Sequence, residues 1–171
     1  VNKFSLHATY RTRLIRAFLA ASRTDKARRP HLFTGFDPND NIAMSDLRAG
    51  KPFHVVNAAL NLVKGRQLAW QERKAESFTI SRLHCGSWHL GYRPSVKYGD
   101  GISLGTALTI SGAAASPNMG YHSSPIVAFL MTLFNVRLGW WLGNPGRPGT
   151  ETWRRGGPGY AVGPLFSEAA G

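Results

Sequence analysis

Turn-forming residues limit where regular secondary structure can lie in this chain. Glycine and proline supply 19 and 10 of the 171 residues. They are frequent in two stretches, residues 23–52 and residues 143–164, and the second of these holds seven Gly and four Pro. Such turn chemistry argues against long regular elements. We therefore predict a basic helix over 1–22, a connector over 23–52, an α/β core over 53–142 and a Gly/Pro-rich tail over 143–171.

The core segment carries patterns of both strands and helices. The apolar run 53–63 predicts a buried strand, and residues 76–83 alternate through Phe78, Ile80 and Arg82 as a second strand would. Between them we expect a hairpin turn at 64–67 and a further short strand at 68–71. A helix is expected over 106–115. The predicted fold class is α/β, with a central sheet flanked by helices.

A second helix is expected from Ser124-Pro125 to about Leu142, because Ser at the N-cap followed by Pro at the first helical position is a common helix start. Its uninterrupted apolar run ends at Met131, whereas a membrane span needs about 20 predominantly apolar residues. A buried core helix is the favoured interpretation. The alternative is that Trp140 and Trp141 dip into a lipid headgroup layer, as interfacial tryptophans do.

Charge is the strongest compositional signal. Lys and Arg number 21 and Asp and Glu 9, which gives a net charge of +12, and +7 of this lies within residues 1–30. The segment 4–21 is predicted to be an amphipathic helix that carries Arg11, Arg13 and Arg16. A basic helix of this kind suggests a lipid surface or another anionic partner. The plain alternative is the solvated face of an ordinary helix.

Other classes of function are disfavoured by what the chain lacks. A single cysteine, Cys85, excludes an intramolecular disulfide, a zinc finger and a CxxC redox site. Nucleic acid is an unlikely partner, because the aromatic residues of the basic segment are not interleaved with glycine as in a stacking platform. No P-loop is present, and Gly99-Asp100-Gly101 lacks the third glycine of a dinucleotide loop. We expect no cofactor.

Gly101–Gly105 matches the G-x-S-x-G pattern of a nucleophile elbow. An elbow needs a buried strand before the serine, but residues 96–100 are polar and contain a glycine. The same residues suit Ser103 as a helix N-cap, so no catalytic residue is assigned and Ser103 stays the weak candidate. His84, Cys85 and His89 are too few for a convincing metal site without a nearby acid, and no metal is expected.

A run of small and polar residues lies between the two predicted helices. Close backbone approach there favours either tight packing or the wall of a pocket. Four residues of this stretch are candidates for lining such a pocket: Ser111, Ser116, Asn118 and His122. A hydrogen-bonded structural loop is the alternative.

Three strings, residues 110–125, 134–145 and 68–78, resemble large bacterial patatin-like phospholipases. The resemblance implies an α/β hydrolase-like, three-layer sandwich with a Ser–Asp dyad. This sequence departs from that family at each catalytic point. No elbow precedes residue 53, no Gly-rich oxyanion loop is present, and the only Asp-Gly, Asp100-Gly101, precedes the small-residue stretch. No catalytic residue is therefore carried over, and the chain is similar to the middle of the domain.

We accordingly expect an internal segment of a patatin-like lipid acyl hydrolase that is inactive alone, which fits a start at Val1. Its expected partners are a lipid or membrane surface and the rest of the parent catalytic domain. The lipid-surface candidates are Arg11, Arg13, Arg16, Trp140 and Trp141. With no visible secretory signal, a bacterial cytoplasmic or membrane-associated location is expected. The alternative is a non-catalytic, basic membrane-surface or interaction module.

Overall fold

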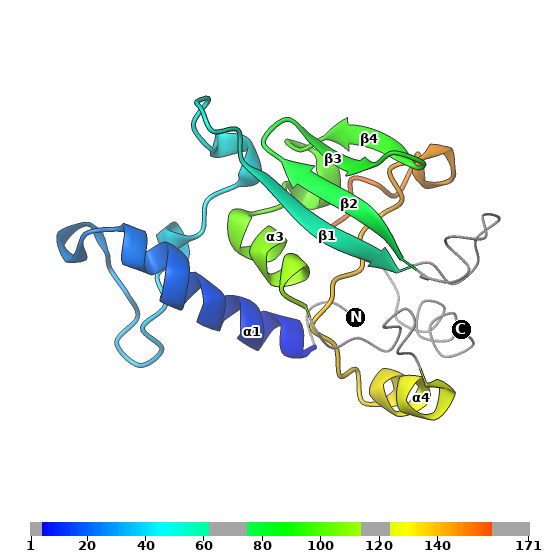
Figure 1. Ribbon diagram of the computed structural model, residues 1–171. Helices are drawn as coiled ribbons and strands as arrows, with labels where there is room; N and C mark the ends of the chain where they lie inside the picture. Colours follow the sequence, from blue (N-terminus) through cyan, green and yellow to red (C-terminus); the bar gives the residue numbers. More distant parts are fainter. Residues whose placement is uncertain (1–4, 62–74, 114–123, 159–171) are drawn as a thin grey trace.

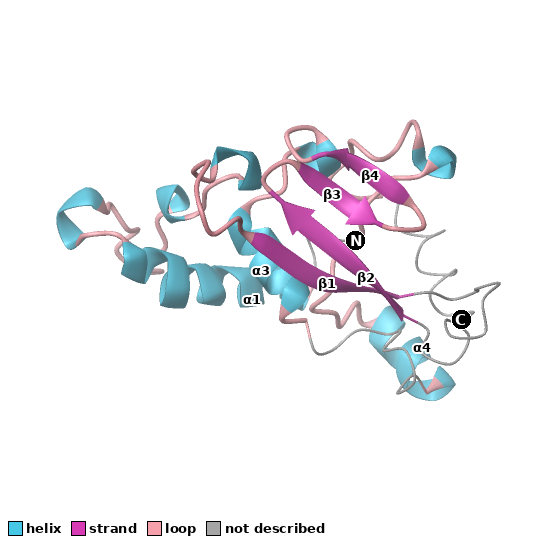
Figure 2. Cartoon of the chain, turned by 45° about the horizontal axis from the view of Figure 1, so that its top comes forward, coloured by secondary structure: helices cyan, strands magenta, loops and turns pink. Residues whose placement is uncertain are grey.

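The computed structural model describes residues 5–61, 75–113 and 124–158 (Figure 1). Its centre is a four-stranded antiparallel sheet with strand order β1-β2-β3-β4, in which neighbours in sequence are neighbours in space (Figure 2). The strands are β1 (Val55–Asn61), β2 (Ala75–Ser81), β3 (His84–Ser87) and β4 (Gly91–Pro94). Together with helices α1 (Leu6–Leu14), α3 (Leu104–Ser111) and α4 (Pro125–Leu133), they confirm a mixed α/β fold.

Strand β2 is the central buried strand. Its alternation places Phe78 and Ile80 in the core, as predicted. Strand β1 was also expected to be buried, and this prediction is wrong, since only Ala58 of β1 is buried. The exposure of β1 follows from its place at the edge of the described sheet. Within the described residues β1 pairs with β2 on one side only, and one face of it is exposed. The expected turn at 64–67 and strand at 68–71 lie outside the described residues.

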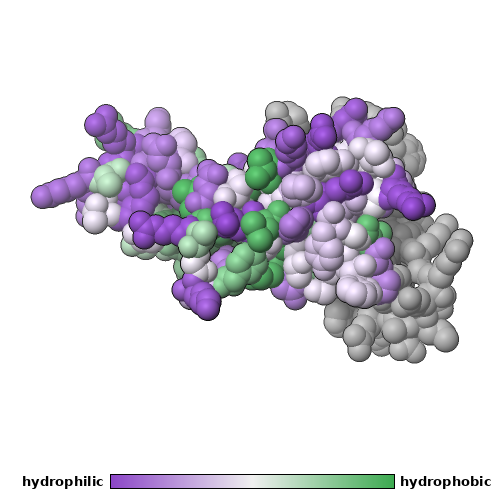
Figure 3. Space-filling view, turned by 90° about the horizontal axis from the view of Figure 1, so that it is seen from above, coloured by the Kyte–Doolittle hydropathy of each residue, from purple (hydrophilic) through white to green (hydrophobic). Residues whose placement is uncertain are grey.

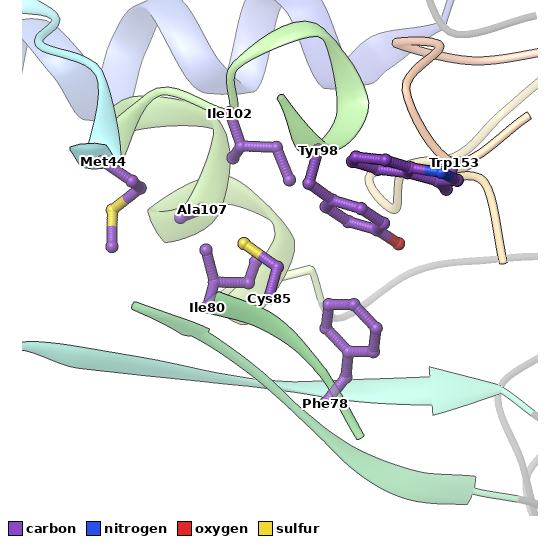
Figure 4. Close-up of a cluster of buried hydrophobic side chains, with 8 residues drawn as sticks. All are labelled: Met44, Phe78, Ile80, Cys85, Tyr98, Ile102, Ala107 and Trp153. Carbon is purple, nitrogen blue, oxygen red and sulfur yellow. The ribbon is translucent and has the colours of Figure 1, made fainter. Parts of the chain in front are cut away.

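The hydrophobic core lies between one face of the sheet and helix α3. Ile80 and Cys85 point from the sheet toward α3, which carries Ala107, and the ring of Phe78 points toward Tyr98 (Figure 4). The rest of the cluster comes from segments distant in sequence, namely Met44, Tyr98, Ile102 and Trp153. The core is therefore assembled from the predicted connector, the predicted core segment and the predicted tail alike.

A helix forms in the amino-terminal segment, as predicted, but the expected apolar face is not found in α1, where His7 is the one buried residue and Leu6 is exposed. Helix α1 continues through a π-helical turn, Ile15–Leu19, and a 3-10 turn, Ala20–Ser22. It packs across α3, where Ile15 is fully buried. A Cβ atom on Gly105 would lie 2.5 Å from Cγ1 of Ile15, so a glycine is required at this helix crossing.

Helix α4 is shorter than expected. It ends at Leu133 rather than near Leu142, because Asn135 adopts φ +50°, the left-handed conformation that terminates helices. The amide of Val136 donates to the Met131 carbonyl at 2.7 Å, and that of Asn135 to the Thr132 carbonyl at 3.1 Å. These bonds form a Schellman motif. In the part of the chain that the structure describes, no helix has the length and apolar character to cross a membrane.

The described part of the Gly/Pro-rich stretch, residues 143–158, consists of turns and loop, as its composition predicts, and it packs against the core. The hydroxyl of Tyr98 donates to the Gly143 carbonyl at 2.6 Å, and the amide of Gly99 donates to the Trp153 carbonyl at 2.9 Å. The glycines here allow close packing, since a Cβ on Gly149 would overlap the Asn144 carbonyl oxygen. Glycine breaks regular structure in sequence patterns, but here the close approach at Gly149 and Gly143 also lets Trp153 enter the core.

Candidate functional site

Ser103, the one residue of the G-x-S-x-G pattern with catalytic potential, is the N-cap of α3. Its Oγ accepts from the amide of Thr106 at 3.2 Å and from the side-chain amide of Asn41 at 3.0 Å, and donates to Oγ1 of Thr106 at 2.9 Å. Its backbone, φ −82° and ψ 157°, is ordinary extended conformation. The hydroxyl is thus engaged in holding the connector to α3, without the strained turn that exposes a nucleophile.

Replacing Ser103 with alanine is expected to lower the free energy of unfolding by about 1 to 2 kcal/mol, the usual cost of losing a helix N-cap. Chemical denaturation measures this. Ser111→Ala is the matched control, because Ser111 is exposed at the other end of the same helix and should change stability by no more than about 0.5 kcal/mol. Ester turnover that Ser103→Ala abolishes would contradict the capping role.

The residues considered for metal binding diverge. His84 is exposed on β3, Cys85 faces the core, and Nδ1 of His89 lies 2.9 Å from Oε1 of Glu76. Burial raises the pKa of the Cys85 thiol, which contacts Oγ of Ser95 at 3.1 Å. No group of three or more potential ligands comes together among the described residues.

Of the four pocket-lining candidates, only Ser111 is described, and it is exposed on the last turn of α3. Ser116, Asn118 and His122 lie outside the described residues. Whether this stretch lines a pocket stays a prediction.

The five lipid-surface candidates divide into two groups. Arg13 and Arg16 are exposed, whereas Arg11 is half-buried, with its guanidinium 3.4 Å from Oγ1 of Thr106. Trp140 and Trp141 are half-buried. The ring of Trp140 lies 4.4 Å from that of His7, and the guanidinium of Arg137 lies 6.0 Å from the ring of Trp141. The tryptophan pair thus helps to anchor the segment after α4.

His7 is the most strongly perturbed base among the described residues. It is fully buried, and its Nδ1–H donates to the Leu138 carbonyl at 2.6 Å, while Nε2 has no hydrogen-bond partner. Burial lowers the pKa of His7 from 6.5 to about 4, opposed by the bond to Leu138 and assisted by the charge of Arg11. His7 is therefore neutral in the folded protein at neutral pH.

The free energy of unfolding should fall as the pH drops from 6.5 toward 4. In this window the unfolded chain binds a proton at His7 that the folded chain does not, so acid favours unfolding by up to about 3 kcal/mol. Urea denaturation across this range measures the effect. His7→Gln should flatten the dependence. His54→Gln, at an exposed position, should preserve it, and equal slopes for both variants would contradict the assignment.

Helix α4 carries more exposed large hydrophobic side chains than any other described helix or strand. Ile126, Leu133 and Phe134 are 74%, 65% and 71% exposed. At about 100° per residue, the exposed side chains span an arc of roughly 160°. Thr132, outside that arc, is buried. The members of this apolar face are Ile126, Val127, Phe129, Leu130, Leu133 and Phe134.

This face was missed because an apolar helix is usually a core helix. No charge or polar stripe in 125–134 marks a solvent side, so the sequence pattern favoured burial. In the structure α4 lies below the sheet, apart from α3 and the core (Figure 1). Exposed apolar patches of this kind commonly mark binding surfaces.

Comparison with protein-family models, with curated proteins and with solved structures finds no match to this chain. What the protein does is therefore inferred from its surface chemistry and from the resemblance described above.

Proposed function

We propose that this chain is a non-catalytic part of a patatin-like lipid acyl hydrolase and that it holds the protein against a lipid surface. The observation that carries the proposal is the exposed apolar face of α4. Six large apolar side chains in water are unfavourable, and burial among lipid chains would gain roughly 25 cal/mol for each Å² of apolar surface removed from water.

The distribution of charge supports a lipid surface that is anionic. The chain carries +12 in total, with +7 in residues 1–30. Each Lys or Arg close to an anionic membrane contributes about 1 kcal/mol. Apolar insertion and electrostatic attraction together give more stable attachment than either alone. The protein would then lie at the membrane surface of a bacterial cell.

The catalytic part of the proposal comes from the resemblance. In the parent protein, an activated serine outside this chain would attack an ester carbonyl and form an acyl-enzyme, with backbone amides holding the oxyanion. The four-stranded sheet and its helices would be one part of the three-layer sandwich of that parent. The capping role of Ser103 supports the placement of the nucleophile elsewhere.

Vesicle flotation tests the lipid-binding proposal. The chain should float with vesicles that contain phosphatidylglycerol, bind vesicles of phosphatidylcholine alone more weakly, and detach as salt is raised. No flotation at low salt would overturn it. In parallel, the chain alone should not turn over p-nitrophenyl esters.

The alternative function is a basic membrane-surface or interaction module without a hydrolase parent. The same apolar face favours it, so binding does not separate the two. The flanking reading frame does. An upstream Gly-x-Ser-x-Gly elbow and a downstream Asp-Gly-Gly support the hydrolase, and their absence supports the module.

A further inference from the structure

A turn at the end of the molecule distant from α4 exposes two adjacent apolar side chains. Leu32 is 104% exposed and Phe33 is 92% exposed, the highest values among the large hydrophobic residues that the structure describes. They occupy the tip of the loop 31–35. The amide of Gly35 donates to the His31 carbonyl at 2.8 Å, and the amide of His31 donates to the Phe36 carbonyl at 3.0 Å.

The base of this loop is fixed by ion pairs. The carboxylates of Asp37 and Asp40 are buried. The guanidinium of Arg23 lies 3.3 Å from Asp37 and 2.7 Å from Asp40, and that of Arg28 lies 3.0 Å from Asp40. Hydrogen bonds from the backbone amides of Arg29 and Asn39 lower the pKa of Asp37, which keeps its carboxylate charged for the ion pair with Arg23 at neutral pH.

The same ion pairs leave the surroundings of the tip positive. They neutralise two of the three acids of residues 5–40, Asp37 and Asp40. The third, Asp25, is exposed. Four bases between residues 13 and 29 are exposed: Arg13, Arg16, Lys26 and Arg29. The guanidinium of Arg16 donates to the Thr34 carbonyl, which places one of these cations beside the tip.

We propose that loop 31–35 is a second point of lipid contact, which inserts Leu32 and Phe33 into an anionic bilayer. This rests on the proposed lipid-binding function and adds to it. A loop already closed by hydrogen bonds and ion pairs loses little conformational freedom on insertion. Leu32 and Phe33 gain by leaving water, while the surrounding bases attract anionic headgroups.

The position of the loop fits this role. Figure 1 shows both the loop that follows α1, at lower left, and α4, at lower right, below the sheet. The face seen from above in Figure 3 shows more hydrophilic than hydrophobic surface, with hydrophilic side chains projecting at its left end. Two separate contacts with the same membrane fix the orientation of a protein on it, which a single helix does not.

The two side chains at the tip favour a lipid bilayer over a nucleic acid as the anionic partner. Nucleic acids are held by several aromatic platforms along a groove, whereas this tip pairs one aromatic residue with an aliphatic one. Leucine offers no face for stacking a base, but it partitions well into hydrocarbon.

The first test is the double variant Leu32→Ser/Phe33→Ser in vesicle flotation with phosphatidylglycerol. Its partition coefficient should fall at least about tenfold, because two apolar side chains no longer leave water. Trp88→Ala, at an exposed aromatic residue on the β3–β4 turn, should bind like the wild type. Unchanged binding of the double variant overturns the loop contact while wild-type binding preserves the proposed function. Absence of wild-type binding overturns both.

The second test reads insertion directly. Cys85 is the only cysteine and is buried, so a cysteine placed at the tip can be labelled selectively. An environment-sensitive fluorophore on Phe33→Cys should shift its emission to the blue when anionic vesicles are added. The same fluorophore on Trp88→Cys should not shift. No shift at position 33 overturns the proposal, as does a shift caused by a single-stranded oligonucleotide and not by vesicles.

Discussion

Replacing Ile126 and Leu133 of α4 with alanine is expected to lower binding to anionic vesicles by ten- to a hundredfold. Both side chains are more than half exposed on the same face of the helix. Each would lose roughly 1 to 1.5 kcal/mol of apolar transfer, and about 1.4 kcal/mol corresponds to a factor of ten. Alanine is the best helix former, so the helix should be retained.

Val96→Ala is the matched control for this variant. Val96 is exposed to a similar degree but lies outside α4, after β4. It should bind vesicles like the wild type. Thermal melting should show little change in either variant, since exposed side chains contribute little to stability. Equal binding of all three proteins would remove α4 from the lipid contact.

The second large effect concerns stability. Trp153→Ala is expected to lower the free energy of unfolding by about 3 to 5 kcal/mol, as large-to-small substitutions of buried aromatic residues do. Trp153 is 7% exposed and stacks on Tyr98 with ring centres 6.5 Å apart. The guanidinium groups of Arg93 and Arg154 lie 5.2 Å and 5.0 Å from its ring.

Trp88→Ala provides the comparison, because it removes the same side chain from a position that is 83% exposed. Urea denaturation should show a change within about 0.5 kcal/mol for Trp88→Ala. If the two variants had equal stability, residues 143–158 would not be part of the cooperative core.

The sequence was informative where local chemistry decides structure. The alternation of Phe78 and Ile80 identified β2 and its buried face, and Ser103 before an apolar run identified the start of α3. Both signals depend only on neighbours in the chain. The pattern of bases and apolar residues in 4–21 likewise identified the first helix.

Features set by distant contacts were not predictable in this way. The core position of Trp153 depends on Tyr98 and on the close approach of Gly149 to Asn144. Whether a face of α4 is exposed depends on which distant segments pack against the helix, and the sequence of α4 alone does not show this. One local signal was overlooked: Asn135 tolerates the left-handed conformation and ends α4, well before the predicted end near Leu142.

The two strands at the edges of the described sheet differ in how readily each could pair with a further strand. Strand β4 is four residues long and ends at Pro94, whereas β1 runs for seven residues, Val55–Asn61, without a charge or a proline. Proline and short length discourage the addition of a further strand, and a long uncharged edge permits it. Any further strand, from another segment or from another chain, is therefore expected to join at β1. The sequences of β1 and β4 thus determine at which edge this sheet can be extended.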